Sequence, residues 1–170
     1  TQKSFTLTLE IPLDKVSVEV QNATLSGENA YSVLFDETIT LLADVDTGYH
    51  FVSYAIGEDV LSEVDSLEYE WLREENVEIV LTVEANTYSI VYDPTTGEGA
   101  TPNTEATYDE DVTLSDGAGF KKTGYTLVGW LFRDTSTTYD LSEELEKPNF
   151  TWVDGGSVTL YAVWRANKYV

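Results

Sequence analysis

One short pattern in this chain has the residue types of a catalytic motif. Asp46-Thr47-Gly48 matches the core of the aspartic-protease signature, in which two carboxylates share a proton and activate water. That chemistry needs two such carboxylates, and the chain has one copy of the pattern. A repeat described below puts Lys122-Thr123-Gly124 at the matching place. We therefore interpret Asp46-Thr47-Gly48 as a turn that leads into a strand.

Acidic segments offer oxygen ligands of the kind that Ca²⁺ prefers. The candidates are Asp44 with Asp46, Glu58-Asp59, and Asp109-Glu110-Asp111 with Asp116. None has the spacing of a twelve-residue calcium loop, and strand alternation separates Glu110 from its two neighbours. Zinc has less support, because His50 is the single imidazole and there is no thiolate. We predict solvated turns and no metal site, with Ca²⁺ in the acidic loops as the open alternative.

Motifs for nucleophilic or cofactor chemistry are missing from the sequence. It contains no G-x-S-x-G elbow, no phosphate loop and no G-x-G-x-x-G. His50 lies between Tyr49 and Phe51, a setting typical of a strand residue. Carboxylate pairs for glycoside cleavage stay an alternative in so acidic a chain, but abundance alone does not indicate them. We predict no catalytic residues, no cofactor and no enzymatic activity.

Composition limits the partners. Of 170 residues, 42% are hydrophobic, enough for globular folding. The 31 acidic and 9 basic residues give a net charge of −22, which repels nucleic acid and anionic lipid. No apolar run approaches the roughly 18 residues of a spanning helix, and no basic and apolar leader opens the chain, so we expect no membrane insertion. Lacking Cys and Met, the chain is expected to be a processed piece of a longer protein.

Both halves of the chain are acidic. Residues 1–86 hold 18 acidic and 3 basic side chains, a net charge of −15, and residues 87–170 hold 13 and 6, a net charge of −7. Neither half is a basic arm that docks on the other. We expect a solvated acidic surface on a monomeric protein.

Three sequence marks recur in the same order. The segment Phe35–Leu41 resembles Tyr108–Leu114, Gly48–Val52 resembles Gly124–Val128, and Val77–Tyr88 resembles Val158–Tyr169, where both runs end in Ala-Asn-x-Tyr. The offsets grow from 73 to 76 to 81, as loop insertions between fixed elements produce. We infer two diverged copies of one unit of about 80 residues.

Alternation with period two predicts strands throughout. Its clearest examples are Val16, Val18 and Val20, the pair Ile39 and Leu41, and the run Ser89–Tyr92. Turn sequences lie between strands, at Asp93–Gly99, Asp116–Gly119 and Asp154–Gly156, the last directly before a strand as hairpin turns require. Residues Ser62–Asn76 fit either a helix capped by Ser62 or a strand followed by a turn at Arg73–Asn76, and we favour the strand. At most one helical turn is expected, at Ser142–Glu146, closed by Lys147-Pro148.

Aromatic side chains make up 12% of the chain. Aromatic side chains can stack on sugars, but a unit this small also needs large rings to build a core. We therefore predict that the four tryptophans, Trp71, Trp130, Trp152 and Trp164, are core residues.

Four spaced blocks of the second copy resemble a known family. They are Tyr88–Asp93, Tyr108–Leu114, the run from Lys122 to Gly129-Trp130, and Val158–Trp164. Together they resemble the Listeria–Bacteroides repeat, the internalin B-repeat-like family of bacterial surface proteins, over nearly all of residues 86–165. The first copy is similar to the divergent branch of that family, with Ser53-Tyr54 where Gly-Trp is typical and a shorter turn-rich segment after its first strand.

The resemblance implies tandem β-grasp-like units, each a small mixed sheet with at most one short helix, on secreted or wall-attached proteins of Gram-positive or gut bacteria. Such repeats serve as spacers and adhesion modules. We accordingly expect one unit at residues 15–85, a second at 86–165 and the start of a third at 166–170. Residues 1–14 either close a preceding unit or supply the first strand of this one. The brief Ala-Asn-x-Tyr link predicts a stiff junction in a linear array.

The function expected from sequence is therefore a non-catalytic stalk or spacer in an extracellular adhesin. The alternatives are a module that binds a glycan or a protein on a host or neighbouring cell, or an accessory domain of a surface hydrolase.

Overall fold

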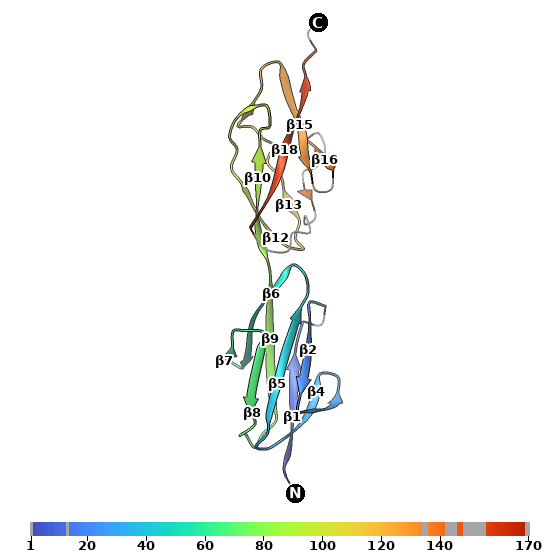
Figure 1. Ribbon diagram of the computed structural model, residues 1–170, viewed down its shortest axis with the longest axis vertical. Coiled ribbons are helices and arrows are strands. Elements are labelled where there is room, and N and C mark those ends of the chain that lie inside the picture. The colour runs from blue at the N-terminus through green and yellow to red at the C-terminus, as the bar shows by residue number, and fades with distance from the viewer. Residues whose placement is uncertain (1, 13, 134–135, 142–145, 148–155, 169–170) are drawn as a thin grey trace. The chain divides into compact units, whose positions relative to one another are not determined.

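The computed structural model describes residues 2–12, 14–133, 136–141, 146–147 and 156–168 (Figure 1). The chain divides into two compact units, residues 1–84 and 85–170, here called the first and second unit. Every regular element in the described residues is a strand, so the predicted mainly β fold is confirmed. The permitted short helix does not occur in that part of the chain.

The first unit consists of two sheets. Its six-stranded sheet has the order β3-β4-β1-β9-β6-β7, and its three-stranded sheet has the order β2-β5-β8. The bounds are β1 Ser4–Glu10, β2 Val16–Gln21, β3 Thr24–Gly27, β4 Ala30–Leu34, β5 Thr38–Val45, β6 Tyr49–Ile56, β7 Asp59–Ser62, β8 Ser66–Glu70 and β9 Val77–Ala85.

The second unit has one five-stranded sheet, ordered β12-β10-β18-β15-β16, and two small strand pairs, β11-β14 and β13-β17. The bounds are β10 Thr87–Asp93, β11 Glu98–Gly99, β12 Thr104–Thr107, β13 Val112–Thr113, β14 Phe120–Lys121, β15 Tyr125–Phe132, β16 Thr137–Asp140, β17 Glu146–Lys147 and β18 Gly156–Ala166.

Five strands of each unit follow the same order. The run β4-β1-β9-β6-β7 of the first unit corresponds to β12-β10-β18-β15-β16 of the second. In the first unit β1 is parallel to β9, the last strand of the unit, and antiparallel to β4. In the second unit β10 is likewise parallel to the last strand, β18, and antiparallel to β12. The pairs β5-β8 and β13-β17 also correspond, and both are antiparallel. One strand arrangement therefore occurs twice in the chain.

The repeated sequence marks fall on equivalent turns. Asp36 and Asp109 both have a positive φ, 68° and 62°, a conformation that Asp tolerates better than most residues. The amide of the next residue closes each turn by donating to a carbonyl three residues earlier, Glu37 to Leu34 and Glu110 to Thr107, both at 3.3 Å. Ile39 and Val112, which follow, are both buried. The marks recur because the same backbone turn and core position recur.

The strand β1 belongs to the first unit. It pairs antiparallel with β4 and parallel with β9, so of the two alternatives for residues 1–14 the first strand of this unit is the one observed. Its counterpart β10 begins right after Asn86, which alone separates β9 from β10. The amides of Phe35 and Tyr108 donate to equivalent carbonyls, of Lys3 at 2.9 Å and Asn86 at 2.8 Å.

The segment Ser62–Asn76 contains the strand β8, Ser66–Glu70, and no helix. The strand β8 places Leu67 opposite Leu41 and ends just before Trp71, which is fully buried. The favoured interpretation is thus confirmed. In the second unit Glu146 and Lys147 form β17, which pairs with β13, so the helical turn allowed at Ser142–Glu146 does not include Glu146. Ser142–Leu145 and Pro148 lie outside the described residues.

Two of the predicted turn sequences, at Asp93–Gly99 and Asp116–Gly119, are turns. The amide of Gly97 donates to the Pro94 carbonyl at 2.9 Å, and that of Phe120 to the Gly117 carbonyl at 2.8 Å. Neither turn joins two strands that pair with each other, because β10 pairs with β12 and β18, while β11 pairs with β14 and β13 with β17. Of the third turn, Asp154 and Gly155 lie outside the described residues.

Each unit has its own hydrophobic core. In the first unit side chains from both sheets meet around Trp71 and Tyr54, and in the second they surround Trp130. These three rings have no exposed surface. Tyr54 takes the place of Trp130, and each ring donates to a backbone carbonyl, the Tyr54 hydroxyl to Asp65 at 3.2 Å and the Trp130 Nε1 to Ser115 at 2.8 Å.

The core prediction for tryptophan is confirmed for Trp71 and Trp130. Trp164 is only partly buried at the edge of the second core, near the end of β18, and Trp152 lies outside the described residues. Gly129 precedes Trp130 for a steric reason, because a Cβ there would stand 2.4 Å from the Tyr139 carbonyl oxygen. Ser53 precedes Tyr54 in the first unit, so that close approach is particular to the second.

Candidate functional site

The aspartic-protease pattern lies in a turn, as predicted. The amide of Tyr49 donates to the Asp46 carbonyl at 3.1 Å, and Gly48 has φ 90°. The same turn occurs before β15, where the amide of Tyr125 donates to the Lys122 carbonyl at 3.0 Å. Since Gly124 also has a positive φ, the Thr-Gly pair serves the turn in both units.

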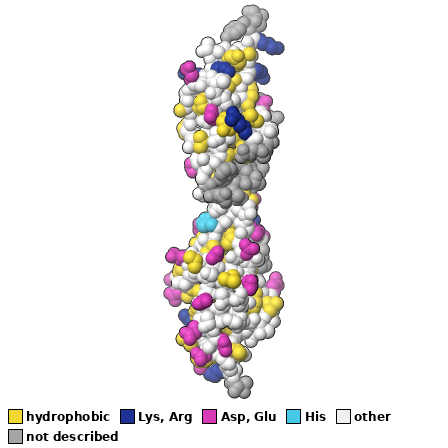
Figure 2. All heavy atoms as spheres, in the orientation of Figure 1, with side chains coloured by type: hydrophobic (Ala, Val, Ile, Leu, Met, Phe, Trp, Pro, Cys, Tyr) yellow, Lys and Arg dark blue, Asp and Glu magenta, His cyan; other side chains and the backbone are white. Residues whose placement is uncertain are grey.

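The other sequence candidates for chemistry are on the surface. His50, which lies on β6, is exposed. The acidic candidates for metal binding are all exposed as well: Asp44, Asp46, Glu58, Asp59, Asp109, Glu110, Asp111 and Asp116. Asp116 Oδ1 accepts from the Ala118 amide at 2.9 Å, which is a turn contact. Within the described ranges no three His, Asp or Glu side chains gather as metal ligands would. Figure 2 shows acidic side chains scattered over the visible face of the first unit.

Three groups in the described residues have clearly altered acidity. Burial, with a smaller contribution from the charge of Asp65, raises the pKa of Tyr54 to about 12. Burial, with a smaller contribution from Tyr88, also raises the pKa of Tyr139. A hydrogen bond to the Tyr69 hydroxyl at 3.0 Å raises the pKa of the exposed Arg73. The two tyrosine shifts follow from core packing.

The Tyr54 shift predicts a loss of stability in alkali. The unfolded phenol ionises near its ordinary pKa of 10.0, and the folded one near 12, so folding favours the protonated form. The stabilisation is complete below about pH 10 and disappears as the pH rises to about 12. Denaturant midpoints of the first unit, measured at several pH values, should therefore fall across this range. The fall should be smaller in Tyr54→Phe, and an identical fall in both proteins would contradict the assignment.

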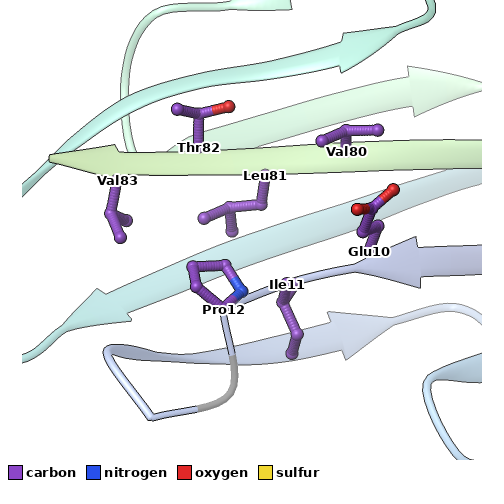
Figure 3. Close-up of a pocket in the computed structure, with 7 residues that line it drawn as sticks. All are labelled: Glu10, Ile11, Pro12, Val80, Leu81, Thr82 and Val83. Atoms are coloured by element: carbon purple, nitrogen blue, oxygen red, sulfur yellow. The ribbon is translucent and has the colours of Figure 1, made fainter.

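A pocket of about 330 Å³ lies in the first unit where β1 ends beside β9 (Figure 3). Figure 3 shows Leu81 and Val83 pointing from β9 towards Ile11 and Pro12, while Val80 and Thr82 point the other way. Glu10 contributes a carboxylate to the lining. Its walls are mostly aliphatic with one charged group, which suits binding better than proton transfer.

Sequence reasoning did not find this pocket. The signal for it was the difference between two aligned positions, Val83 in the first copy and Trp164 in the second.

Basic side chains line two further hollows, both in the second unit. One of about 280 Å³ includes Lys121 and Lys122, and one of about 630 Å³ includes Arg165 and Lys168. Lys122 is held in place, because its Nζ donates to Thr96 Oγ1 at 2.7 Å and lies 3.9 Å from the centre of the Tyr125 ring. These two hollows and the pocket beside β9 are all open to solvent.

Comparison of the chain with protein-family models and with curated proteins gave no match. No helix in the described part of the chain is long and apolar enough to cross a membrane.

Proposed function

We propose that this chain is a non-catalytic pair of repeat modules, of the internalin B-repeat-like kind, in the stalk of a bacterial secreted or cell-surface adhesin. The observation that carries the proposal is the repeated strand order, β4-β1-β9-β6-β7 and β12-β10-β18-β15-β16. Each copy encloses its own core. A module that is complete in itself can be strung in tandem, with each copy in contact chiefly with its neighbours.

The link between the units supports the same proposal. Only Asn86 separates the last strand of the first unit from the first strand of the second, so the chain passes from unit to unit almost wholly as strand. A spacer has to keep the parts on either side of it apart, and a link of one residue adds little flexibility to the array.

Surface labelling tests the proposed location. Antibodies raised against the folded chain should label intact cells of the organism that encodes it, or detect the protein in its medium. Labelling that appears only after the cells are permeabilised would contradict a surface role. Single-molecule pulling on the chain tests the spacer role, since two self-contained modules should unfold in two separate events and a joint core in one.

The pocket beside β9 favours one alternative, a ligand-binding module. An array of glycans and host matrix proteins, probed with this chain with and without Ca²⁺, separates the alternatives. A spacer is expected to retain none of them. Specific retention would replace the spacer role by binding, and retention that needs Ca²⁺ would point to the acidic loops.

A further inference from the structure

In both units the last strand continues beyond the end of the first. The pairing of β1 with β9 ends at Glu10 and Val80, and that of β10 with β18 ends at the equivalent pair, Asp93 and Tyr161. The last strands then run on to Ala85 and Ala166. Five residues in each unit, Leu81–Ala85 and Ala162–Ala166, thus lie past the first strand.

The second unit covers this extension with its own chain. The turn after β10 folds back on β18, where Thr95 Oγ1 donates to the Ala162 carbonyl at 3.3 Å. The Trp164 Nε1 donates to the Pro94 carbonyl at 2.9 Å. The indole also packs on Gly97, where a Cβ would stand 2.4 Å from the ring. The Trp164 side chain and the turn after β10 together cover the edge of β18 beyond Tyr161.

The first unit lacks both of these ties. Pro12 stands where the second unit has Thr95, and it has no hydroxyl to donate. Val83 stands where the second unit has Trp164, and it offers neither an indole N–H nor the area of the ring. The pocket of about 330 Å³ lies at this place in the first unit, and both Pro12 and Val83 line it (Figure 3).

We propose that the first unit binds an extended peptide of a partner protein, which pairs with Leu81–Ala85 as an added strand and inserts an aromatic side chain between Val83 and Pro12. Main-chain pairing at a strand edge supplies affinity in this mode of recognition, and the pocket supplies the choice of side chain. An aromatic occupant is expected because the second unit fills the equivalent place with an indole.

Charge selects the peptide's flanking residues. Glu10 lines the pocket and Glu84, where the second unit has Arg165, follows Val83; both are exposed. The surrounding half of the chain carries a net charge of −15. Lys or Arg on either side of the aromatic residue complements this field, and acidic residues are repelled by it. This inference goes beyond the proposed spacer role and does not depend on where the protein is located.

The test is an NMR titration of the ¹⁵N-labelled whole chain with the blocked peptide Lys-Thr-Trp-Thr-Lys. Saturable shifts are expected at the amides of Ile11 and Leu81–Glu84. The peptides Glu-Thr-Trp-Thr-Glu and Lys-Thr-Ala-Thr-Lys should each bind at least about ten times more weakly. No binding, shifts centred elsewhere, or equal binding of the acidic peptide would overturn the proposal. Concentration-dependent shifts at these amides without peptide would also overturn it, because the occupant would then be a second copy.

Val83→Trp places in the pocket the side chain that the second unit carries, and should reduce peptide binding at least about tenfold. Val60→Trp adds the same ring at an exposed valine on the edge strand β7, which does not line the pocket, and should bind as the unaltered chain does. Should Val83→Trp not fold, Ile11→Trp blocks the same pocket from the opposite wall. Unchanged binding in the folded blocking variant would overturn the proposal.

Discussion

Replacing Trp130 by alanine is expected to unfold the second unit and leave the first unit folded. The ring is fully buried and lies against Tyr92 and Phe120, with centroid distances of 4.7 and 5.8 Å. Truncation of a buried Trp costs about 3–5 kcal/mol, a large part of a small domain's total stability. Because the cores are separate, that cost should fall on the second unit alone. Denaturant unfolding followed by circular dichroism, and by the fluorescence of Trp71, should show this.

Phenylalanine variants sharpen that comparison. Trp130→Phe also removes the hydrogen bond to Ser115 and leaves its carbonyl without that donor. Trp71 Nε1 is buried with no hydrogen-bond partner among the described residues, so Trp71→Phe removes none. We expect the Trp130 variant to lose about 1 kcal/mol more than the Trp71 variant. A Trp130→Ala chain in which both units unfold at a common, lowered midpoint would contradict separate cores.

Gly119→Ala is expected to cost the second unit about 3 kcal/mol, the upper end of what overpacking usually costs. A Cβ at Gly119 would stand 1.8 Å from the Ala100 carbonyl oxygen, and backbone cannot move aside as a flexible side chain can. The neighbouring strands β11 and β14 would have to separate, and Phe120, which packs on Trp130, would be displaced. The denaturant midpoint of the second unit measures the loss.

The matched control is Gly27→Ala in the first unit. Its Cβ would meet the Ala30 Cβ at 3.5 Å, an ordinary contact, so the midpoint of that unit should hardly change. If Gly119→Ala were as well tolerated as Gly27→Ala, the close approach of the backbones in the second unit would be wrong.

The strands and the duplication could be predicted from sequence because they depend on local patterns. Alternation at Ile39 and Leu41 identifies a strand with one buried face, and both residues are fully buried. The repeat was visible because Asp36 and Gly48 occupy turns whose backbone favours particular residue types, and the same turns recur at Asp109 and Gly124. Ser62–Asn76 was harder, since its apolar residues fit two periods, and pairing of Leu67 with Leu41 decided it.

Features that depend on distant pairing could not be predicted. Turn sequences at Asp93–Gly99 and Asp116–Gly119 indicate a reversal of the chain but not which strands pair, and the partners came from elsewhere. Trp164 is of a residue type that is typical of cores, yet its position near the end of β18 leaves it partly exposed. The pocket in the first unit depends on where the pairing of β1 with β9 stops, which is a property of two segments 70 residues apart.

The most direct test of the account is to produce residues 1–85 and 86–170 as separate chains and record the ¹⁵N–¹H spectrum of each. We predict that each fragment is folded and that its amide peaks, away from the cut, superimpose on those of the whole chain. Two self-contained copies of one β unit require that outcome. A fragment that is unfolded alone and folds only when the other is added would show that the two copies share their stability, and would contradict the account.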